Sequence, residues 1–362
     1  MSGSTVISID AMGGDKGPEP VLDGLQLALE EEPGLRFIVH GDKAALAPLL
    51  EKRPRLAEAC EVRHAPGVIR MEDKPARALR EGRDSSMWHA LKTVAAGDAT
   101  VAVSPGNTGA LMAMAMFVLR RAPGVDRPAI AVQWPAANPH GYNIVLDMGA
   151  DIRADAENLL QYAIMGAEYA QLNFNLARPR VGILNVGSEE TKGPEELRTA
   201  AGLIRRAVEQ SDYDFEYIGF VEGNDLLTAK ADVIVTDGFT GNVALKAGEG
   251  TASFIRTALQ NAFRHSVWSQ LGTLFAMTSL KRLKARIDPR RANGGVFLGL
   301  NGAVVKSHGG TDALGFCSAV TLGAKMAAKN FSTHVAEQVA RLEVHEEAGA
   351  RTGPPAAGKG GT

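Results

Sequence analysis

The chain has 362 residues, of which 45% are apolar and 22% charged, and its 39 basic side chains nearly balance 41 acidic ones. This length suits one large α/β domain or two closely packed lobes. The balanced charge lacks the basic footprint of a general nucleic-acid-binding protein, so we expect no nucleic-acid partner. Two cysteines, Cys60 and Cys317, do not form a disulfide framework.

The chain shows no targeting or membrane-spanning signal. The apolar run Val6 to Ile9 ends at Asp10 and a Gly-rich turn rather than at a signal-peptide cleavage site. No segment approaches the ~18 consecutive apolar residues of a transmembrane helix. We therefore expect a cytoplasmic protein whose only contact with a membrane is peripheral.

Short apolar segments recur along the chain, and each ends at a turn rich in Gly or Asp before a helical pattern begins. The predicted strands are Val6 to Ile9, Phe37 to Val39, Thr100 to Val103, Ile130 to Gln133, Ile144 to Leu146, Val181 to Asn185, Glu216 to Ile218 and Val233 to Thr236. This alternation predicts a three-layer α/β/α sandwich with a mostly parallel sheet. We expect one large domain over residues 1–345 and a disordered tail at 346–362, which is rich in Pro and Gly.

Ligands of open parallel sheets bind beyond the carboxyl ends of the strands, so the turns after the strands are candidate sites. The first turn holds Asp10, Gly13, Gly14 and Asp15. Glycines permit close approach of the backbone to a ligand, and the aspartates orient hydroxyl groups or a nearby base. A tight turn with Asp as a helix cap is the alternative.

The turn after Thr100 to Val103 contains Ser104, Gly106, Asn107, Thr108 and Gly109 and opens an apolar helix. Unpaired N–H groups and the positive end of the helix dipole favour phosphate binding there. Helix capping by Asn107 or Thr108 is the alternative. The turn lacks the Gly-Lys-Ser/Thr of a Walker loop, and no dinucleotide fingerprint follows any predicted strand.

Later turns supply the remaining candidates. Lys192 follows the strand Val181 to Asn185, and Asp237, Thr240 and Asn242 follow Val233 to Thr236. His308 lies in a Gly-rich stretch near the end of the chain. A lone lysine in a polar loop is often only solvated, and an isolated histidine is often structural, so both alternatives stay open.

Several chemistries lack their signatures. No His or Cys pair has the spacing of a metal site, so no zinc centre is expected. The nucleophile elbow G-x-S-x-G is absent, and neither cysteine lies in a Gly-rich turn after a strand. A covalent acyl-enzyme is therefore disfavoured.

The motifs DAMGGD, SPGNTGA, LDMGAD, ILNVGSEETKG, VEGND, TDGFTGNVALK and GLNGAVVKSHG occur in this order over roughly residues 5 to 332. Together they resemble the phosphate acyltransferase (PlsX) family of bacterial glycerolipid synthesis. The resemblance implies a fold of the isocitrate dehydrogenase and phosphotransacetylase type, a homodimer, and transfer of a long-chain acyl group from acyl carrier protein to inorganic phosphate. It implies no cofactor. Pro105, Asp151 and Phe220 depart from the family pattern.

Combining the resemblance with residue chemistry, we expect Ser104, Asn107, Thr108 and the glycines 106 and 109 to bind phosphate. The expected catalytic residues are Lys192, Asp237, Asn242 and His308; Asp10, Gly13, Gly14, Asp15 and Thr240 shape the site. The alternatives are short-chain transfer from acyl-CoA, as in phosphotransacetylases, and a non-catalytic scaffold at the membrane. A dehydrogenase is a more distant alternative, since no metal-binding carboxylate cluster or dinucleotide fingerprint is visible.

Two basic segments, Arg63 to Arg83 and Lys281 to Arg291, are candidate docking surfaces for the acidic carrier protein. Apolar residues at helical spacing in Glu249 to Ile287 predict a projecting helical pair. We expect this pair to form the dimer contact, and its part from Trp268 to Leu280 to contact anionic membrane, where the downstream glycerol-phosphate acyltransferase would collect the product.

Overall fold

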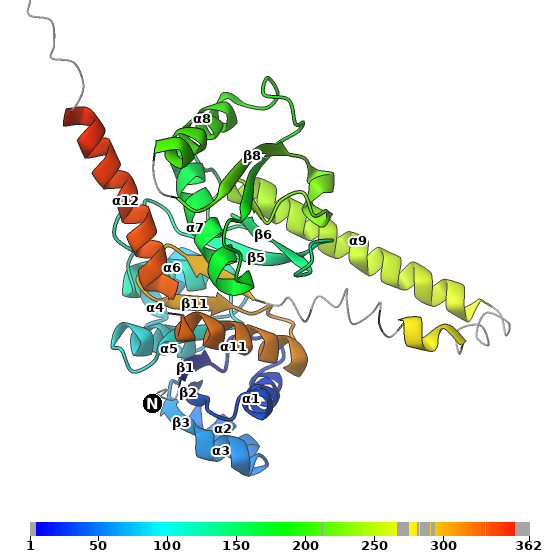
Figure 1. Ribbon diagram of the computed structural model, residues 1–362. Helices are drawn as coiled ribbons and strands as arrows, with labels where there is room; N and C mark the ends of the chain where they lie inside the picture. Colours follow the sequence, from blue (N-terminus) through cyan, green and yellow to red (C-terminus); the bar gives the residue numbers. More distant parts are fainter. Residues whose placement is uncertain are drawn as a thin grey trace, which may run out of the picture.

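A mixed sheet of eleven strands, in the order β3-β2-β1-β4-β11-β10-β5-β6-β9-β7-β8, forms the centre of the computed structural model (Figure 1). The structure describes residues 5–210, 213–265, 275–280, 282, 290, 294–329 and 331–351. The strands are β1 (Val6–Asp10), β2 (Arg36–Gly41), β3 (Cys60–His64), β4 (Val101–Ser104), β5 (Ala129–Pro135), β6 (Tyr142–Leu146), β7 (Arg180–Leu184), β8 (Glu216–Val221), β9 (Val233–Val235), β10 (Gly295–Leu298) and β11 (Ala303–Lys306).

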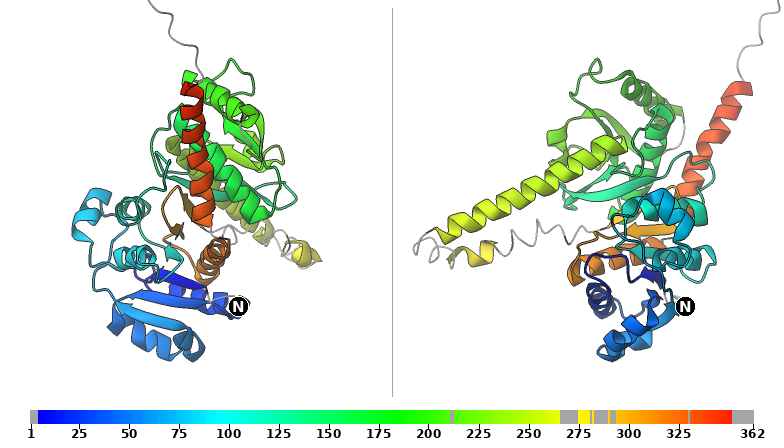
Figure 2. Two further views of the ribbon diagram at one scale, coloured as in Figure 1. Left: turned by 60° about the vertical axis from the view of Figure 1, so that its left-hand side comes forward. Right: turned by 180° about the vertical axis from the view of Figure 1, so that it is seen from behind.

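Helices cover both faces of the sheet, which confirms the predicted α/β/α fold (Figures 1 and 2). They are α1 (Glu19–Glu31), α2 (Lys43–Glu51), α3 (Pro54–Ala59), α4 (Pro75–Glu81), α5 (Ser86–Ala95), α6 (Thr108–Val118), α7 (Ala156–Phe174), α8 (Glu195–Gln210), α9 (Gly238–Arg264), α11 (Ala313–Ala328) and α12 (Phe331–Arg351), with a short 3-10 helix, η1 (Gly223–Leu227). Helices α1, α7, α8 and α11 pack on one face, and α4, α5 and α6 pack on the other.

All eight predicted strands are present, and most of them are apolar runs buried between two helical layers, although the edge strand β8 is exposed at Glu216 and half-buried at Tyr217 and Ile218. Three further strands, β3, β10 and β11, were not predicted. Strand β11 lies in the Gly-rich stretch that includes His308, and its residues Ala303 to Val305 are buried.

The strands run in two directions, and this decides which turns meet. Strands β1, β2, β3, β4 and β11 are parallel to one another, and β10 is antiparallel to β11 and β5. Strand β6 is antiparallel to β5, and β9, β7 and β8 follow the direction of β6. The carboxyl ends of β1, β4 and β11 therefore lie at one edge of the sheet, and those of β6, β9 and β7 lie at the opposite edge.

Helix α9 starts on the sheet and then projects from the body of the protein (Figures 1 and 2). Its first turns pack beside β6, whereas its outer half from Glu249 onward is almost entirely exposed. This is the first helix of the predicted projecting pair. Of the second, residues 275–280 are helical, and Trp268 and Leu274 lie outside the described residues.

Helix α12 continues to Arg351, so its end includes residues 346–351, which the composition predicts to be disordered. The rest of that predicted tail, residues 352–362, lies outside the described part of the chain. Among the described helices, none is both long and apolar enough to cross a membrane.

Candidate active site

Three polar residues end three neighbouring strands and form a row across one edge of the sheet. Lys306 of β11 pairs with Ser104 of β4. Asp10 of β1 lies beside Ser104, since the preceding residues of these strands, Ile9 and Val103, are paired. Side chains of a strand alternate between faces, so all three project to the face covered by α5 and α6. All three are buried, with Lys306 only 9% exposed.

Asp10 links this row to helix α5. Its Oδ2 accepts a hydrogen bond from Ser104 Oγ at 2.6 Å, and its Oδ1 accepts one from Ser86 Oγ of α5 at 2.6 Å. Burial raises the pKa of the Asp10 carboxyl, while the two serine hydroxyls and the backbone N–H of Met12 favour its charged form. Asp10 thus fixes the positions of Ser86 and Ser104; its site-shaping role stays a prediction.

Glycines allow the first two predicted turns to touch. A Cβ at Gly13 would lie 2.5 Å from Oδ2 of Asp10 and 2.8 Å from Cα of Gly106, so a side chain there requires a backbone shift. Ser104 Oγ also accepts the backbone N–H of Gly106 at 3.1 Å, which holds the second turn against the row. Gly14 lies near Pro105 and Gly309.

Asn107 caps α6 and ties a neighbouring loop to it. Its Oδ1 accepts the N–H of Ala110 at 2.9 Å, and its Nδ2 donates to the carbonyls of Met71 at 2.5 Å and Asp73 at 3.2 Å. The side chain is therefore used by the protein itself. The N–H groups of Thr108 and Gly109 have no acceptor among the described residues, so they remain available to an anion.

Lys306 is the residue of this site that the sequence analysis did not select. Its Nζ donates to the carbonyl of Pro105 at 3.4 Å and to that of Ser307. Burial lowers its pKa to about 8, opposed by the negative charges of Asp10 and Asp15 and reinforced by the positive charge of Lys246. The signal in the sequence is a lysine directly after a short apolar run, in the motif GLNGAVVKSHG.

Asp15 and His308 lie at the exposed rim of the same edge. The N–H of Asp15 donates to the Gly309 carbonyl at 3.0 Å, and this bond joins the turn after β1 to the loop after β11. His308 is exposed, and its Nδ1 accepts the N–H of Gly310 at 3.2 Å. The sequence-remote turns at residues 10–15, 104–109 and 307–310 are therefore brought together.

Residues of α9 approach this edge from the other half of the sheet. Helix α9 begins at the opposite edge, where Asp237 accepts the N–H of Thr240 at 2.8 Å and its hydroxyl at 2.7 Å. Asn242 lies beside Gly149, one turn further along. Lys246 follows after another turn and is close enough to Lys306 for its charge to affect the pKa of that residue.

Lys192 follows β7 and is exposed in its own loop. Its Nζ pairs with Glu189 Oε1 at 3.1 Å. Because β7 runs opposite to β4, this loop follows a strand that ends at the other edge, and no described contact joins Lys192 to the row of Asp10, Ser104 and Lys306. Its catalytic role stays a prediction, like those of Asp237 and Thr240.

The departures from the family pattern have simple structural surroundings. The charge of Asp151 is paired with Arg127, and Phe220 is a buried core residue of β8. Pro105 is buried, and its carbonyl accepts from Lys306. Neither Asp151 nor Phe220 contacts the row of polar residues among the contacts described above.

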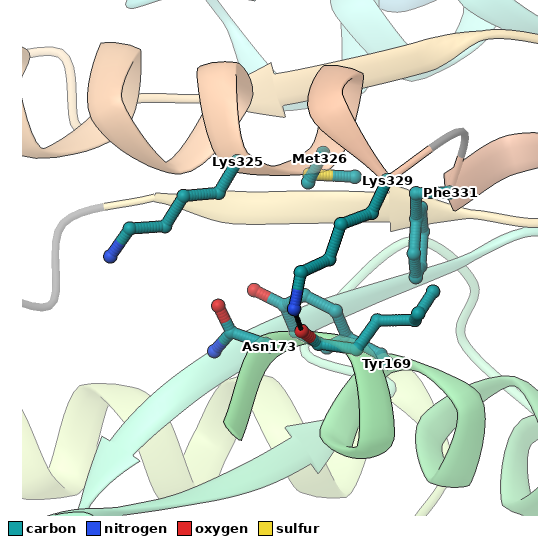
Figure 3. Close-up of a pocket in the computed structure, with 7 residues that line it drawn as sticks. Tyr169, Asn173, Lys325, Met326, Lys329 and Phe331 are labelled. Carbon is teal, nitrogen blue, oxygen red and sulfur yellow. Dashed lines mark hydrogen bonds between the residues drawn. The ribbon is translucent and has the colours of Figure 1, made fainter. Parts of the chain in front are cut away.

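No group of three or more His, Cys, Asp or Glu side chains among the described residues is placed to hold a metal ion. A small cavity of about 40 Å³ lies on the other face of the sheet, between α7, α11 and α12 (Figure 3). Ligand sites are usually near 300–1,000 Å³, so this cavity does not compete with the row as a substrate site.

Comparisons with known proteins identify the family of the chain. A family model described as "Fatty acid synthesis protein" matches residues 5–334. A phosphate acyltransferase from Jannaschia sp. (strain CCS1) is 57% identical over 341 residues, covering 94% of this chain and 93% of that protein. Another, from Paracoccus denitrificans (strain Pd 1222), is 56% identical over 336 residues, covering 93% of this chain and 90% of that protein.

Among solved structures, a phosphotransacetylase from Streptococcus pyogenes matches with a TM-score of 0.60 at 16% identity, covering 91% of this chain and 95% of that one. EutD phosphotransacetylase from Staphylococcus aureus matches with a TM-score of 0.58 at 17% identity, covering 90% of this chain and 95% of that one. Identities this low show a shared fold alone. The near full-length matches at more than half identity show more: the chain belongs to the fatty acid synthesis protein family and, within it, to the phosphate acyltransferases.

Proposed function

We propose that this enzyme transfers a long-chain acyl group from acyl carrier protein to inorganic phosphate, giving acyl phosphate for glycerolipid synthesis. The observation that carries the proposal is the edge formed by β1, β4 and β11. There, two N–H groups at the start of α6 lie beside the buried row of Asp10, Ser104 and Lys306. This arrangement supports binding of a small anion, and family membership supplies the acyl group as the second substrate.

The reaction needs little covalent chemistry from the protein. A phosphate oxygen attacks the thioester carbonyl, a C–O bond forms, the C–S bond breaks, and the thiolate leaves and takes up the proton released by phosphate. Thr108 and Gly109 hold the phosphate through their N–H groups, and the hydrogen-bonded Asp10 and Ser104 fix the turn that presents them. Asn242 and His308 are the proposed donors to the thioester oxygen, and Lys192 is a proposed source of positive charge.

The carrier protein is proposed to dock beside α4. Arg70, Lys74, Arg77, Arg80 and Arg83 are exposed there, and the carbonyls of Met71 and Asp73, within this segment, bind Asn107 at the start of α6. The second basic segment, Lys281 to Arg291, lies largely outside the described residues. Replacing Arg70 and Lys74 by Glu should raise KM for acyl-ACP at low salt, and high salt should weaken wild-type binding similarly. A KM that is independent of salt would contradict this docking mode.

The outer half of α9 is proposed as the dimer contact. Phe254 is 73% exposed and Ile255 is 49% exposed on a helix that projects from the body, which leaves an apolar face without a partner in one subunit. Phe254→Glu should give monomers in light scattering, while Arg256→Glu, a charge change on the same helix, should leave the wild-type mass. Wild-type protein that is monomeric at micromolar concentration would overturn the proposal.

Membrane contact is proposed for the region that includes Phe275, which is 93% exposed. Replacing Leu274 and Phe275 by Glu should abolish co-sedimentation with anionic vesicles and leave acyl phosphate synthesis in solution intact. Unchanged co-sedimentation would place the contact elsewhere. Delivery of the product to a downstream glycerol-phosphate acyltransferase at the membrane is part of the same proposal.

Incubation of the purified protein with palmitoyl-ACP and phosphate tests the proposed reaction. We expect acyl phosphate, trapped as the hydroxamate, to appear with release of the free carrier thiol. Parallel reactions with acetyl-CoA and palmitoyl-CoA separate this activity from a phosphotransacetylase-like one. A higher kcat/KM for acetyl-CoA than for acyl-ACP would assign the short-chain reaction, and no acyl phosphate from any donor would reject the proposed catalysis.

A further inference from the structure

Lys306 is a buried cation without a counter-ion. It is only 9% exposed, and none of the described carboxylates lies within ion-pair distance of its Nζ. Its two acceptors are the backbone carbonyls of Pro105 and Ser307. Carbonyls orient an ammonium group but do not neutralise it, so the charged form is poorly compensated in the protein alone.

The elements that surround Lys306 bring charges of both signs close to it. Asp10 at the end of β1 and Asp15 in the following turn are negative, and Lys246 on α9 is positive. Asp10 already accepts hydrogen bonds from Ser86 and Ser104, so its oxygens serve those hydroxyls rather than Lys306. Lys246 Nζ is itself paired with Glu249 Oε2 at 2.8 Å, so its charge is already compensated within α9.

An anion beside Lys306 would compensate the buried charge that the two carbonyls leave uncompensated. The N–H groups of Thr108 and Gly109 lie on the same turn as the Pro105 carbonyl that Lys306 contacts. An anion held by that helix end therefore lies near the Lys306 amine as well.

We propose that Lys306 is a phosphate-binding residue of this enzyme. The inference rests on the proposed function, since it assigns the phosphate of that reaction to a named side chain. Lys306 provides the positive charge that compensates the phosphate dianion during attack on the thioester.

A purely structural lysine, which only ties down the Pro105 turn, predicts different kinetics. Its loss would disturb binding of both substrates or the stability of the fold. A phosphate ligand predicts a selective effect. We expect Lys306→Met to raise KM for phosphate at least tenfold while KM for acyl-ACP changes less than twofold. Lys306→Arg should retain part of the affinity, because it keeps the charge.

Lys329→Met is the matched control. Like Lys306, Lys329 donates from Nζ to a backbone carbonyl, that of Leu172, but it does so on the opposite face of the sheet (Figure 3). It also donates to Asn175 Oδ1 at 2.9 Å and lies outside the proposed site. This variant should have the wild-type KM for phosphate.

The pH dependence of phosphate affinity provides an independent test. The pKa of Lys306 is about 8, so wild-type affinity for phosphate should fall as the pH rises above that value, in a range where phosphate stays dianionic. Asp10, Asp15 and Lys246, with its ion-pair partner Glu249, keep their own contributions in every variant. Lys306→Arg should lose this alkaline fall, because a guanidinium stays charged throughout the range.

Thermal unfolding in increasing inorganic phosphate separates failure of this inference from failure of the proposed reaction. Phosphate should raise the Tm of the wild type and of Lys329→Met but not that of Lys306→Met, whether or not acyl phosphate is formed. If Lys306→Met fails to fold, the charge-keeping Lys306→Arg carries the test through the alkaline fall in phosphate affinity. Wild-type phosphate affinity in Lys306→Met, or an unchanged alkaline fall in Lys306→Arg where Lys306→Met does not fold, would overturn the proposal.

Discussion

The two edges of the sheet are equally rich in Gly, Asp, Asn and Thr, yet their side chains are used differently. At the edge formed by β1, β4 and β11, Asp10 bonds serines from two other elements, and Lys306 contacts the turn after β4. At the opposite edge, polar side chains serve their own loops: Asp237 caps α9, and Lys192 pairs with Glu189 three residues away. Among these residues, those of the first edge come from several elements and form one buried cluster, whereas those of the opposite edge do not.

Asp147 makes the contrast clearest, because it resembles Asp10 in sequence context and in burial. Its two oxygens accept backbone N–H groups from Ile130 and from residues 149–151, so the whole carboxylate shapes the loop after β6. Burial raises its pKa, while the backbone donors favour its charged form. A buried aspartate after a strand therefore indicates a site only where its partners are side chains from other elements.

The largest expected effect comes from removing Asp10. Asp10→Ala leaves the hydroxyls of Ser86 and Ser104 without their buried acceptor, which should lower the free energy of unfolding by about 2–4 kcal/mol. The turn before α6 loses its anchor as well, so acyl phosphate formation should fall at least a hundredfold. Urea unfolding and the hydroxamate assay measure the two effects. Ser86→Ala, which removes only the bond to α5, should keep most of the activity; equal losses in both variants would contradict the account.

Lys306→Met should stabilise the protein while it impairs phosphate binding. The pKa of Lys306 is lowered to about 8 from 10.5, so at neutral pH its charge costs the fold about 3 kcal/mol. The unfolded chain binds more protons than the folded one between pH 8 and 10.5, so wild-type stability should rise across this window. Urea unfolding at several pH values should show that rise in the wild type and its absence in the variant. A variant less stable than wild type at pH 7 would contradict the unpaired charge.

Gly241→Ala tests the opposite edge of the sheet, where we expect a substitution to lower the stability of the fold. A Cβ there would lie 1.9 Å from the carbonyl oxygen of Asp147, so α9 must shift. We expect a loss of about 2–3 kcal/mol in the free energy of unfolding, with KM for phosphate nearly unchanged. Gly250→Ala is the matched control on the same helix, because its Cβ meets open space, and it should stabilise the protein by up to about 1 kcal/mol. Equal stability of both variants would show that α9 is not seated on Asp147.

Lys192→Met should have the smallest effect. The side chain is exposed and already paired with Glu189, so we expect kcat/KM for phosphate to fall only several-fold, less than for Lys306→Met. Steady-state kinetics at fixed acyl-ACP measure the ratio. Wild-type kinetics would remove Lys192 from the mechanism, and a loss larger than that of Lys306→Met would reverse the ranking of the two edges.

The fold was predictable because its strands are buried on both faces and therefore read as apolar runs, as in Val181 to Asn185. Strand β11 was not predicted, because Ala303 to Lys306 is short and lies between glycines. For this reason the sequence analysis did not select Lys306, which ends a strand and does not lie in a loop. The proximity of the turns at Asp10 and Ser104 was predictable, since β1 and β4 are parallel neighbours.

The place of Lys192 and Asp237 was not predictable from their motifs. Whether a strand ends at one edge or the other depends on its neighbours in the sheet, and nothing local in Val181 to Asn185 or Val233 to Thr236 encodes it. The antiparallel strands β10 and β5 reverse the direction between the two halves. Asn107 illustrates a second limit, because the sequence allowed both phosphate binding and capping, and the structure shows that its side chain caps α6.

The position of bound phosphate tests the central claim most directly. A crystal structure of the enzyme with inorganic phosphate, at a concentration near its KM, should show the anion within hydrogen-bonding distance of Lys306 Nζ and of the N–H groups of Thr108 and Gly109. Phosphate bound instead at the loop of Lys192, with the edge of β1, β4 and β11 unoccupied, would contradict the assignment of the active site to that edge.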